Sequence, residues 1–174
     1  MCVELRAWDV SFAPALAKTI GNKKVQDNLR DGIPFPYTEA NAREFIGGVL
    51  AAKDVFAFAV FADGLSCGSI SVTRGGNVHR RTGELGYYLA EPFWGRGIGT
   101  AAVKKMCAFV FENSDIARIF AEPFSQNAAS CRVLEKCGFT CEGILRKNAE
   151  KNGKLLDMKM YSLLKEEFSP EMKK

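Results

Sequence analysis

The chain has 174 residues, enough for one domain with a substantial core, and its 47% hydrophobic and 25% charged residues are typical of a folded, soluble protein. Its net charge of +4 is small and its basic residues are scattered, which argues against nucleic-acid binding. The longest apolar run, residues 55–62, is too short to span a bilayer, and early charges interrupt any signal peptide. We therefore expect a single cytoplasmic domain over residues 1–174, a monomer or homodimer, with neither nucleic acid nor membrane as a partner.

The six cysteines lie at positions 2, 67, 107, 131, 137 and 141, in a chain too large for a small disulfide-stapled domain. No Cys-x-x-Cys pair occurs, and His79 is the single histidine. This pattern favours reduced, mostly buried thiols and predicts no metal site.

The first third of the chain predicts one strand and two helices. Residues 3–8 form a strand-like run, and a short helical pattern follows Ser11 and ends near Gly21. A loop over residues 31–37 carries two prolines and two aromatic residues. Thr38 can cap the next helix, whose apolar positions recur at helical spacing, namely Ala42, Phe45, Ile46, Val49 and Leu50.

The middle of the chain predicts strands. Residues 55–61 are β-rich, and Asp63-Gly64 is a hairpin turn signal before a partner strand with Ile70 and Val72 in alternation. Another strand follows over residues 82–89.

The last third predicts further helices and strands in alternation. We expect a helix over residues 100–113, a strand over 119–121, a helix over 128–137 that ends at Gly138, and strands over 139–145 and 155–164 around an Asn152-Gly153 turn. The resulting order, β-α-α-β-β-β-α-β-α-β-β, indicates a mixed sheet with helices on its faces.

A glycine-rich segment, Trp94-Gly95-Arg96-Gly97-Ile98-Gly99-Thr100, links the strand over residues 82–89 to the helix that follows it. Its glycines permit a sharp turn and close approach to a ligand, and the helix start presents unpaired N–H groups with a partial positive charge. This geometry suits a diphosphate, with Arg96 adding a full charge. Taken alone, the segment fits a turn without a ligand equally well.

A second segment, Asn127 to Phe139, decides between these alternatives. With it the chain resembles the RimJ/RimL type of GNAT-superfamily N-acetyltransferase from about Phe35 to Glu166. The resemblance rests on five features in order: Pro36-Tyr37-Thr38, Gly83-Glu84-Leu85-Gly86-Tyr87, the glycine turn, the Asn-to-Phe segment, and a closing strand with Asp157 and Tyr161. It implies an α/β (α+β), GNAT-like fold, with a central mixed, mostly antiparallel sheet of about seven strands, helices on both faces, and a splayed parallel pair that holds the cofactor.

The resemblance further implies acetyl-CoA as donor, with its pyrophosphate on the turn and its pantetheine arm between residues 84–89 and 119–121. The implied cofactor contacts are Leu89, Ala90, Gly95, Arg96, Gly97, Ile98, Gly99, Thr100, Asn127 and Ser130. Two positions depart from the family pattern. Trp94 stands where Gln or Arg is usual, and Leu134 stands where many relatives carry a tyrosine that protonates the departing thiolate.

Glu84 is the first candidate for general base, because strand alternation places it on one face with Gly86 and Tyr88. The alternative is a carboxylate paired with an arginine of a neighbouring strand. For the general acid three candidates remain. The resemblance places Ser130 near the thioester sulfur, although a small core serine is common; Tyr161 is the second candidate, although core packing explains it better; the third is water.

The predicted reaction transfers acetyl from acetyl-CoA to a primary amine, preferably a protein N-terminal α-amine, with a backbone N–H near Leu89 or Ala90 stabilising the oxyanion. Phe35, Tyr37 and Tyr88 are the candidate substrate-side residues, although a loop anchor explains Phe35 more simply. Alternative acceptors are a polyamine, an antibiotic or an amino acid.

Other functions stay open at this point. The chain could be a non-catalytic acyl-CoA-binding module, or an interaction domain that uses the loop near Tyr37. A dinucleotide site is a poor match, because strands in hairpins precede the glycine turn. Three charged residues of the last helix are interpreted as a solvated face, namely Arg132, Glu135 and Lys136.

Overall fold

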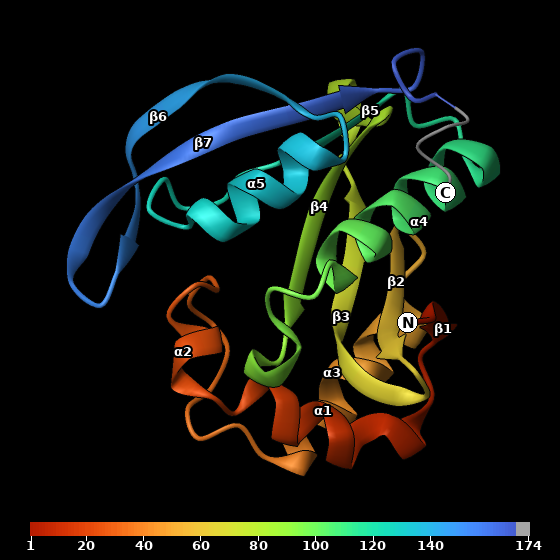
Figure 1. Ribbon diagram of the computed structural model, residues 1–174, viewed down its shortest axis with the longest axis vertical. Helices are drawn as coiled ribbons and strands as arrows, with labels where there is room; N and C mark the ends of the chain where they lie inside the picture. Colours follow the sequence, from red (N-terminus) through yellow and green to blue (C-terminus); the bar gives the residue numbers. More distant parts are fainter. Residues whose placement is uncertain (170–174) are drawn as a thin grey trace.

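The computed structural model describes residues 1–169, so residues 170–174, which the single-domain prediction includes, lie outside the described part. Its centre is a seven-stranded sheet with the strand order β1-β2-β3-β4-β5-β7-β6 (Figure 1). The strands are β1 (Val3–Ala7), β2 (Val55–Ala62), β3 (Leu65–Arg74), β4 (Thr82–Leu89), β5 (Arg118–Ala121), β6 (Thr140–Lys151) and β7 (Lys154–Leu164). The β4–β5 pair is parallel and the other neighbouring pairs are antiparallel.

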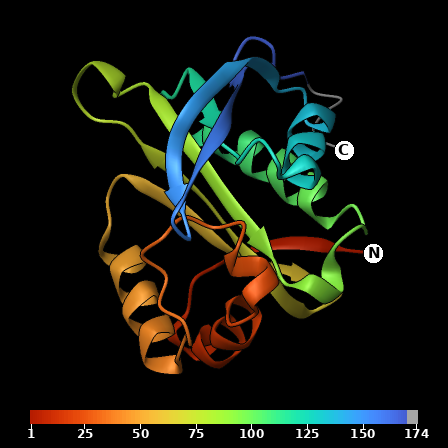
Figure 2. The same ribbon diagram turned by 90° about the vertical axis from the view of Figure 1, so that its left-hand side faces the viewer.

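Helices cover both faces of the sheet (Figures 1 and 2). The first three lie together on one face, and the last two lie on the other. Their bounds are α1 (Ala13–Ile20), α2 (Lys23–Gln26), α3 (Glu39–Ala51), α4 (Ile98–Asn113) and α5 (Ala128–Lys136). Each face has its own hydrophobic core, with Met106 and Leu134 fully buried on the α4–α5 side and Ile46 fully buried on the α1–α3 side. The predicted mixed, mostly antiparallel sheet with helices on both faces is therefore confirmed.

Local sequence signals explain why most element boundaries were predictable. Thr38 caps α3 in a reciprocal capping box with Asn41, and Gly138 takes a φ of 85° just after α5. The Asn152-Gly153 turn has φ values of 52° and 73°, which is the left-handed conformation that a tight hairpin turn requires. All eleven predicted elements are present in the predicted order.

One helix was missed, and two elements differ from their predicted bounds by more than one residue. β6 runs to Lys151, whereas the predicted strand ended at residue 145. α2 was not predicted, because four residues are too few to show helical periodicity. α4 begins at Ile98, two residues before the predicted start at Thr100. The reason is Gly97, whose φ of 77° turns the chain directly into the helix.

The sheet opens between β4 and β5, and this opening positions the site. β4 pairs with β3 over Gly83–Leu89, but it pairs with β5 only over Thr82–Glu84. β5 ends at Ala121, and Pro123 follows soon after, where it offers no backbone N–H for further pairing. The predicted splayed parallel pair is therefore present, and the rest of β4 has no strand partner on its β5 side.

The cysteines are unpaired, and four of the six are buried, as predicted: Cys67, Cys107, Cys131 and Cys137. Burial raises the pKa of Cys67 and of Cys137 to about 11. Within residues 1–169, no group of His, Cys, Asp and Glu side chains is arranged to hold a metal ion. Within the same residues, none of the helices has both the length and the apolarity that a membrane span requires.

An ion pair joins three strands at the far edge of the sheet. Glu142 on β6 accepts two hydrogen bonds from Arg118 on β5, at 2.6 and 2.5 Å, and a third at 2.7 Å from Ser162 on β7. These bonds, that of Arg118 foremost, lower the pKa of Glu142 to about 2. Since the Glu142 side chain is 40% exposed, we expect Glu142→Gln to lower the free energy of unfolding by only about 1 kcal/mol at pH 7, measured by urea denaturation.

The contribution of Glu142 should depend on pH in one direction. Because its pKa is lower in the folded state than the usual value of about 4.3, its stabilisation is complete above that value and disappears as the pH falls toward 2. The stability difference between wild type and Glu142→Gln should be constant from about pH 5 to 8 and shrink below about pH 4. Equal stabilities at pH 7 would contradict the prediction, and Glu39→Gln on the exposed face of α3 is the control.

Candidate active site

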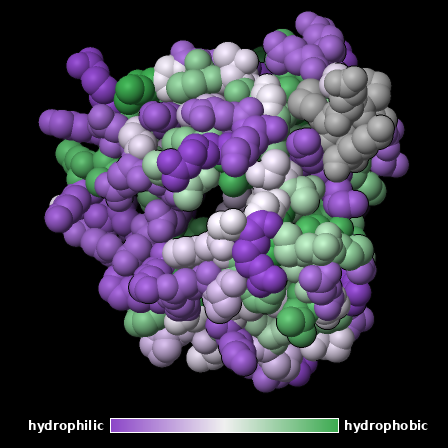
Figure 3. Space-filling model, viewed as in Figure 1, coloured by the Kyte–Doolittle hydropathy of each residue, from purple (hydrophilic) through white to green (hydrophobic). Residues whose placement is uncertain are grey.

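Two cavities lie along the opened side of β4. The first, the turn cavity, has a volume of about 360 Å³ and is lined by the glycine turn, the end of β4 and α5. The second, the loop cavity, has about 410 Å³ and is lined by β3, β4, α1 and the loop after α2. The two share six lining residues, which are Asn28, Leu29, Tyr87, Tyr88, Asn127 and Ser130. The cavities therefore meet between β4 and the start of α5, where Figure 3 shows a hollow with a largely hydrophilic rim.

The glycine turn forms one wall of the turn cavity. Gly95 and Gly97 have φ values of 71° and 77°, a conformation that strongly favours glycine. The first three N–H groups of α4, those of Ile98, Gly99 and Thr100, have no partner within the helix. They and Arg96 line the cavity, so the predicted turn residues lie together.

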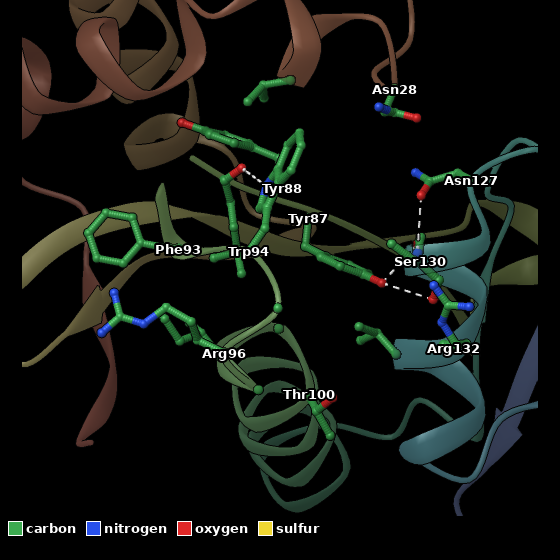
Figure 4. Close-up of a pocket in the computed structure, with 18 of the residues that line it drawn as sticks. Asn28, Tyr87, Tyr88, Phe93, Trp94, Arg96, Thr100, Asn127, Ser130 and Arg132 are labelled. Carbon is green, nitrogen blue, oxygen red and sulfur yellow. Dashed lines mark hydrogen bonds between the residues drawn. The ribbon is translucent and has the colours of Figure 1, made fainter. Parts of the chain in front are cut away.

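Trp94 fastens the turn to the strand before it. Its indole N–H donates a hydrogen bond of 2.7 Å to the backbone oxygen of Leu89 (Figure 4). Trp94, which stands where Gln or Arg is usual, thus has a structural role, since its side chain fixes the distance between the end of β4 and the turn.

The turn cavity has a basic lining. Its charged members among the described residues are Arg96, Arg132 and Lys136, with no acidic residue beside them. Arg132, Glu135 and Lys136 are all exposed, so the predicted solvated face is confirmed, and two of its members, Arg132 and Lys136, also line the turn cavity. Ala129, Val133 and Lys136 follow an i, i+4, i+7 spacing, and this stripe of α5 faces the cavity. The guanidinium of Arg96 lies 5.8 Å from the ring centre of Phe93, within cation–π range.

A pair of hydroxyl groups spans the opening between β4 and α5. The Tyr87 Oη and Ser130 Oγ atoms are 2.8 Å apart, and both residues line both cavities (Figure 4). Asn127 caps α5 by accepting a hydrogen bond of 3.1 Å from the Ser130 N–H, which fixes the serine at the helix start. Burial raises the pKa of the Tyr87 phenol. Tyr87 was missed in the sequence, because alternation placed it on the face opposite Glu84.

The two backbone candidates for an oxyanion donor differ in availability. The Ala90 N–H donates to the Cys67 oxygen at 2.8 Å and is therefore not available as an oxyanion donor, and Ala90 lines neither cavity. Because of this bond, Gly68 and Leu89 form a non-hydrogen-bonded pair of the antiparallel β3–β4 ladder. In such a pair the N–H group of each residue points away from the partner strand. The Leu89 N–H therefore points toward the opening beside β4.

Glu84 lines the loop cavity together with Tyr37 and Tyr88. As predicted, its strand neighbour Leu85 points to the opposite core. The predicted arginine partner exists, but Arg30 comes from the loop after α2 rather than from a strand.

Phe35 does not belong to the site. Its side chain is 61% exposed and lines neither cavity, so its interpretation as a hydrophobic loop anchor was wrong, and neither cavity gives it a place in an acceptor wall. The loop turns through a cis Phe35–Pro36 bond and leaves Tyr37, not Phe35, toward the cavity.

The remaining candidates for a proton donor lie elsewhere. Tyr161 is 1% exposed, donates a hydrogen bond of 2.8 Å to Glu135, and lines neither cavity. Leu134, at the position where many relatives carry a tyrosine, is fully buried in the core. Of the two side chains proposed from sequence as general acid, Ser130 is thus the one that lies at the junction of the cavities.

Comparison with known proteins identifies the family. A model described as the acetyltransferase (GNAT) domain matches residues 3–140. The chain belongs to the GNAT acetyltransferase family. One relative is YdaF of Bacillus subtilis (strain 168), which is named as a candidate ribosomal N-acetyltransferase. The two sequences are 38% identical over 109 residues, and this match covers 63% of the present chain. The match spans 59% of YdaF, and matches to two further Bacillus N-acetyltransferases span 48% and 49% of their lengths, so the chain spans about half the length of these relatives.

Solved structures share the fold over nearly the whole chain. The ribosomal L7/L12 α-N-protein acetyltransferase RimL, solved with coenzyme A, superposes with a TM-score of 0.85 at 25% identity, covering 93% of each chain. A spermidine N-acetyltransferase from Vibrio cholerae, solved with CoA and spermine, has the same fold, with a TM-score of 0.81 at 19% identity over 95% and 97% of the two chains. The dinucleotide-binding alternative is wrong, because the sheet has only one parallel pair among the described strands.

The glycine turn can be tested by substitution. Gly97→Ala places a side chain in the left-handed conformation at a cost of about 1–2 kcal/mol, which the turn can relieve by moving away from the cavity. We expect the Kd for coenzyme A, measured by calorimetry, to rise about tenfold. Gly153→Ala is the matched control, since its φ of 73° is similar but it lies in the β6–β7 turn. An unchanged Kd in Gly97→Ala would show that the turn does not hold the ligand.

Proposed function

We propose that the protein transfers an acetyl group from acetyl-CoA to a primary amine. The observation that carries this proposal is the meeting of two cavities of opposite charge at the opened side of β4. The turn cavity is lined by basic residues and suits the anionic coenzyme, and the loop cavity carries Glu84 and Glu122 against a single Arg30 and suits an amine. Tyr87 and Ser130 stand at the junction, where the two substrates would react.

In this proposal the pyrophosphate of acetyl-CoA lies on the glycine turn. The N–H groups of Ile98, Gly99 and Thr100 and the charge of Arg96 would hold it, as helix N-termini hold phosphate groups. The pantetheine arm would then follow β4 along the edge that β5 leaves free, past Leu89 and toward Asn127.

The amine must lose a proton before its nitrogen attacks the thioester carbonyl. Glu84 is the proposed base, either directly or through one water molecule. At pH 7, deprotonation costs about 1.4 kcal/mol for an α-amine of pKa about 8 and about 4.6 kcal/mol for a lysine of pKa about 10.4. A single carboxylate suffices for the first more readily than for the second. The Leu89 N–H, free of β3, is the proposed donor to the tetrahedral oxyanion.

The carbon–sulfur bond then breaks, and the thiolate takes up a proton or a hydrogen bond. Ser130 is the proposed hydrogen-bond donor to the thiolate sulfur, and Tyr87 positions it. Because burial raises the pKa of Tyr87, its phenol stays protonated at neutral pH. Its proton lies within reach of Ser130 Oγ, at 2.8 Å, and of the Ser130 backbone oxygen, at 3.3 Å, and in this proposal it is donated to Oγ. The Ser130 proton is then free to face the sulfur. In this proposal the Tyr87 phenol on β4 supports the reaction in a chain that carries Leu134 at the helix position where many relatives have a tyrosine.

The proposed acceptor is a protein N-terminal α-amine. The deprotonation cost favours it, and so does the similarity to RimL, whose name describes an α-N-protein acetyltransferase. A specific observation favours a small amine as the second candidate, since the loop cavity has only about 410 Å³ and an ion pair between Asp31 and Lys151 lies beside it. Release of coenzyme A with a peptide bearing a free N-terminus, and not with its acetylated counterpart, tests the first candidate directly.

Replacement of the base is the first test of the mechanism. We expect Glu84→Gln to lower kcat about 10- to 100-fold at pH 7, because the neutral amide cannot accept the amine proton. Glu91→Gln is the matched control, since its carboxylate also pairs with a basic residue and has the same 34% side-chain exposure, but it lines neither cavity. Retention of full kcat in Glu84→Gln would remove Glu84 from the proposed chemistry.

Replacement of the hydroxyl pair is the second test. Ser130→Ala and Tyr87→Phe should each lower kcat about tenfold or more with little change in KM for acetyl-CoA, because they act after both substrates are bound. The double variant should be no slower than the slower single variant, since the two hydroxyls act as one unit. Tyr161→Phe, which removes a phenol outside both cavities, should keep its kcat. Additive losses in the double variant would argue against a shared role.

A further inference from the structure

Arg30 reaches into the loop cavity from the loop that follows α2, and the proposed mechanism leaves it without a role. One of its terminal nitrogens lies 2.5 Å from Glu84 Oε1 and 3.6 Å from Glu122 Oε2. The two carboxylate side chains are 34% and 19% exposed, whereas that of Arg30 is 59% exposed. The guanidinium therefore enters from the solvent side and contacts two carboxylates that lie deeper.

The position of Arg30 conflicts with the role proposed for Glu84. A base must offer a carboxylate oxygen to the incoming amine, but Oε1 of Glu84 already accepts the guanidinium. Arg30 must therefore move, or share the carboxylate, when an acceptor is bound. Its high exposure permits such a movement without any loss of core packing.

Two contacts hold the loop after α2, and neither involves the exposed side chain of Arg30. Asp31 pairs with Lys151, at the tip of the β6–β7 hairpin, at 2.6 Å. Figure 2 shows this tip close to the loop after α2. On the other side, the Gln26 side-chain amide donates to the Pro34 oxygen at 3.1 Å. These two contacts tie the loop to the β6–β7 turn and to α2, and displacement of Arg30 requires only that its own exposed side chain swing outward.

The charge of the cavity indicates which group takes its place. The charged residues that line the loop cavity are Glu84, Glu122 and Arg30, so the lining retains a net negative charge even with Arg30 present. An acceptor carboxylate bound to Arg30 would lie beside two carboxylates and be repelled. A protonated amine would instead be attracted, and amines with pKa values of about 8 to 10 arrive in that form at neutral pH.

We propose that Arg30 is a specificity-determining residue: its guanidinium occupies the place at Glu84 and Glu122 that the cationic amine of the acceptor takes. The inference rests on the proposed function. Acceptors are selected by their ability to displace an internal cation, so a cationic amine without a neighbouring carboxylate is favoured. Once seated, the amine gives its proton to Glu84 and attacks as the neutral base.

The test is the binding of a cationic probe to the coenzyme A complex, which needs no turnover. Alanyl-alanine amide, which has a free α-amine as its single amine and no carboxylate, is titrated by calorimetry into wild type and Arg30→Gln, each saturated with coenzyme A. We expect its Kd to fall about two- to fivefold in Arg30→Gln, the range expected when a competing exposed ion pair is removed. Glu122→Gln should raise the Kd, and Arg43→Gln, which breaks an exposed pair on α3, should leave it unchanged.

Several outcomes would overturn the inference. A higher Kd in Arg30→Gln would show that Arg30 binds the acceptor. An unchanged Kd, or no binding by Arg30→Gln, would show that the Arg30 guanidinium does not occupy the position of the acceptor amine. The gain in affinity should also shrink at 0.5 M salt, where ionic interactions at an exposed site are screened. Failure of the proposed function is separate, because it appears as absence of coenzyme A release with every amine, whatever the ratio of the two Kd values.

Discussion

The loss of the strand partner of β4 after Glu84 is the constraint on which the rest of the site depends. Three parallel residue pairs hold β4 to β5, and beyond them the backbone of β4 faces an opening instead of a strand. Unpaired strand groups need partners, and a ligand that lies along the strand can provide them. The same opening admits the start of α5, so that Ser130 faces Tyr87 across it at 2.8 Å. One interruption of the sheet therefore creates the proposed cofactor channel, the free Leu89 N–H and the hydroxyl pair.

Charge divides the opening into two parts with different ligands. On the α4–α5 side, the basic residues Arg96, Arg132 and Lys136 line the turn cavity, and on the α1–α3 side the carboxylates of Glu84 and Glu122 line the loop cavity. An anionic coenzyme and a cationic amine are each attracted to the side where they are needed, and each is repelled from the other. The two cavities meet at Tyr87 and Ser130, which is where the proposed function places the reaction.

The sequence predicted those features that depend on local chemistry. Caps such as Thr38, the glycine turn and the Asn152-Gly153 hairpin act over a few residues, and the helices and strands that they delimit were found. Features that depend on distant parts of the chain were missed. The Arg30–Glu84 contact joins a loop to a strand far along the sequence, and the direction of Arg132 is set by the placement of α5 over the opening. Periodicity cannot show either, and it also cannot show that the Ala90 N–H is already bonded to Cys67.

The central claim is that this opening holds acetyl-CoA, and thermal unfolding tests it most directly. At about a hundred times its Kd, a ligand adds roughly 2.7 kcal/mol, which for a domain of this size corresponds to a rise in Tm of about 5–10 °C. The account predicts such a rise with acetyl-CoA and none with NADH, which shares a pyrophosphate but lacks the pantetheine arm. No rise with saturating acetyl-CoA, or an equal rise with NADH, would contradict it.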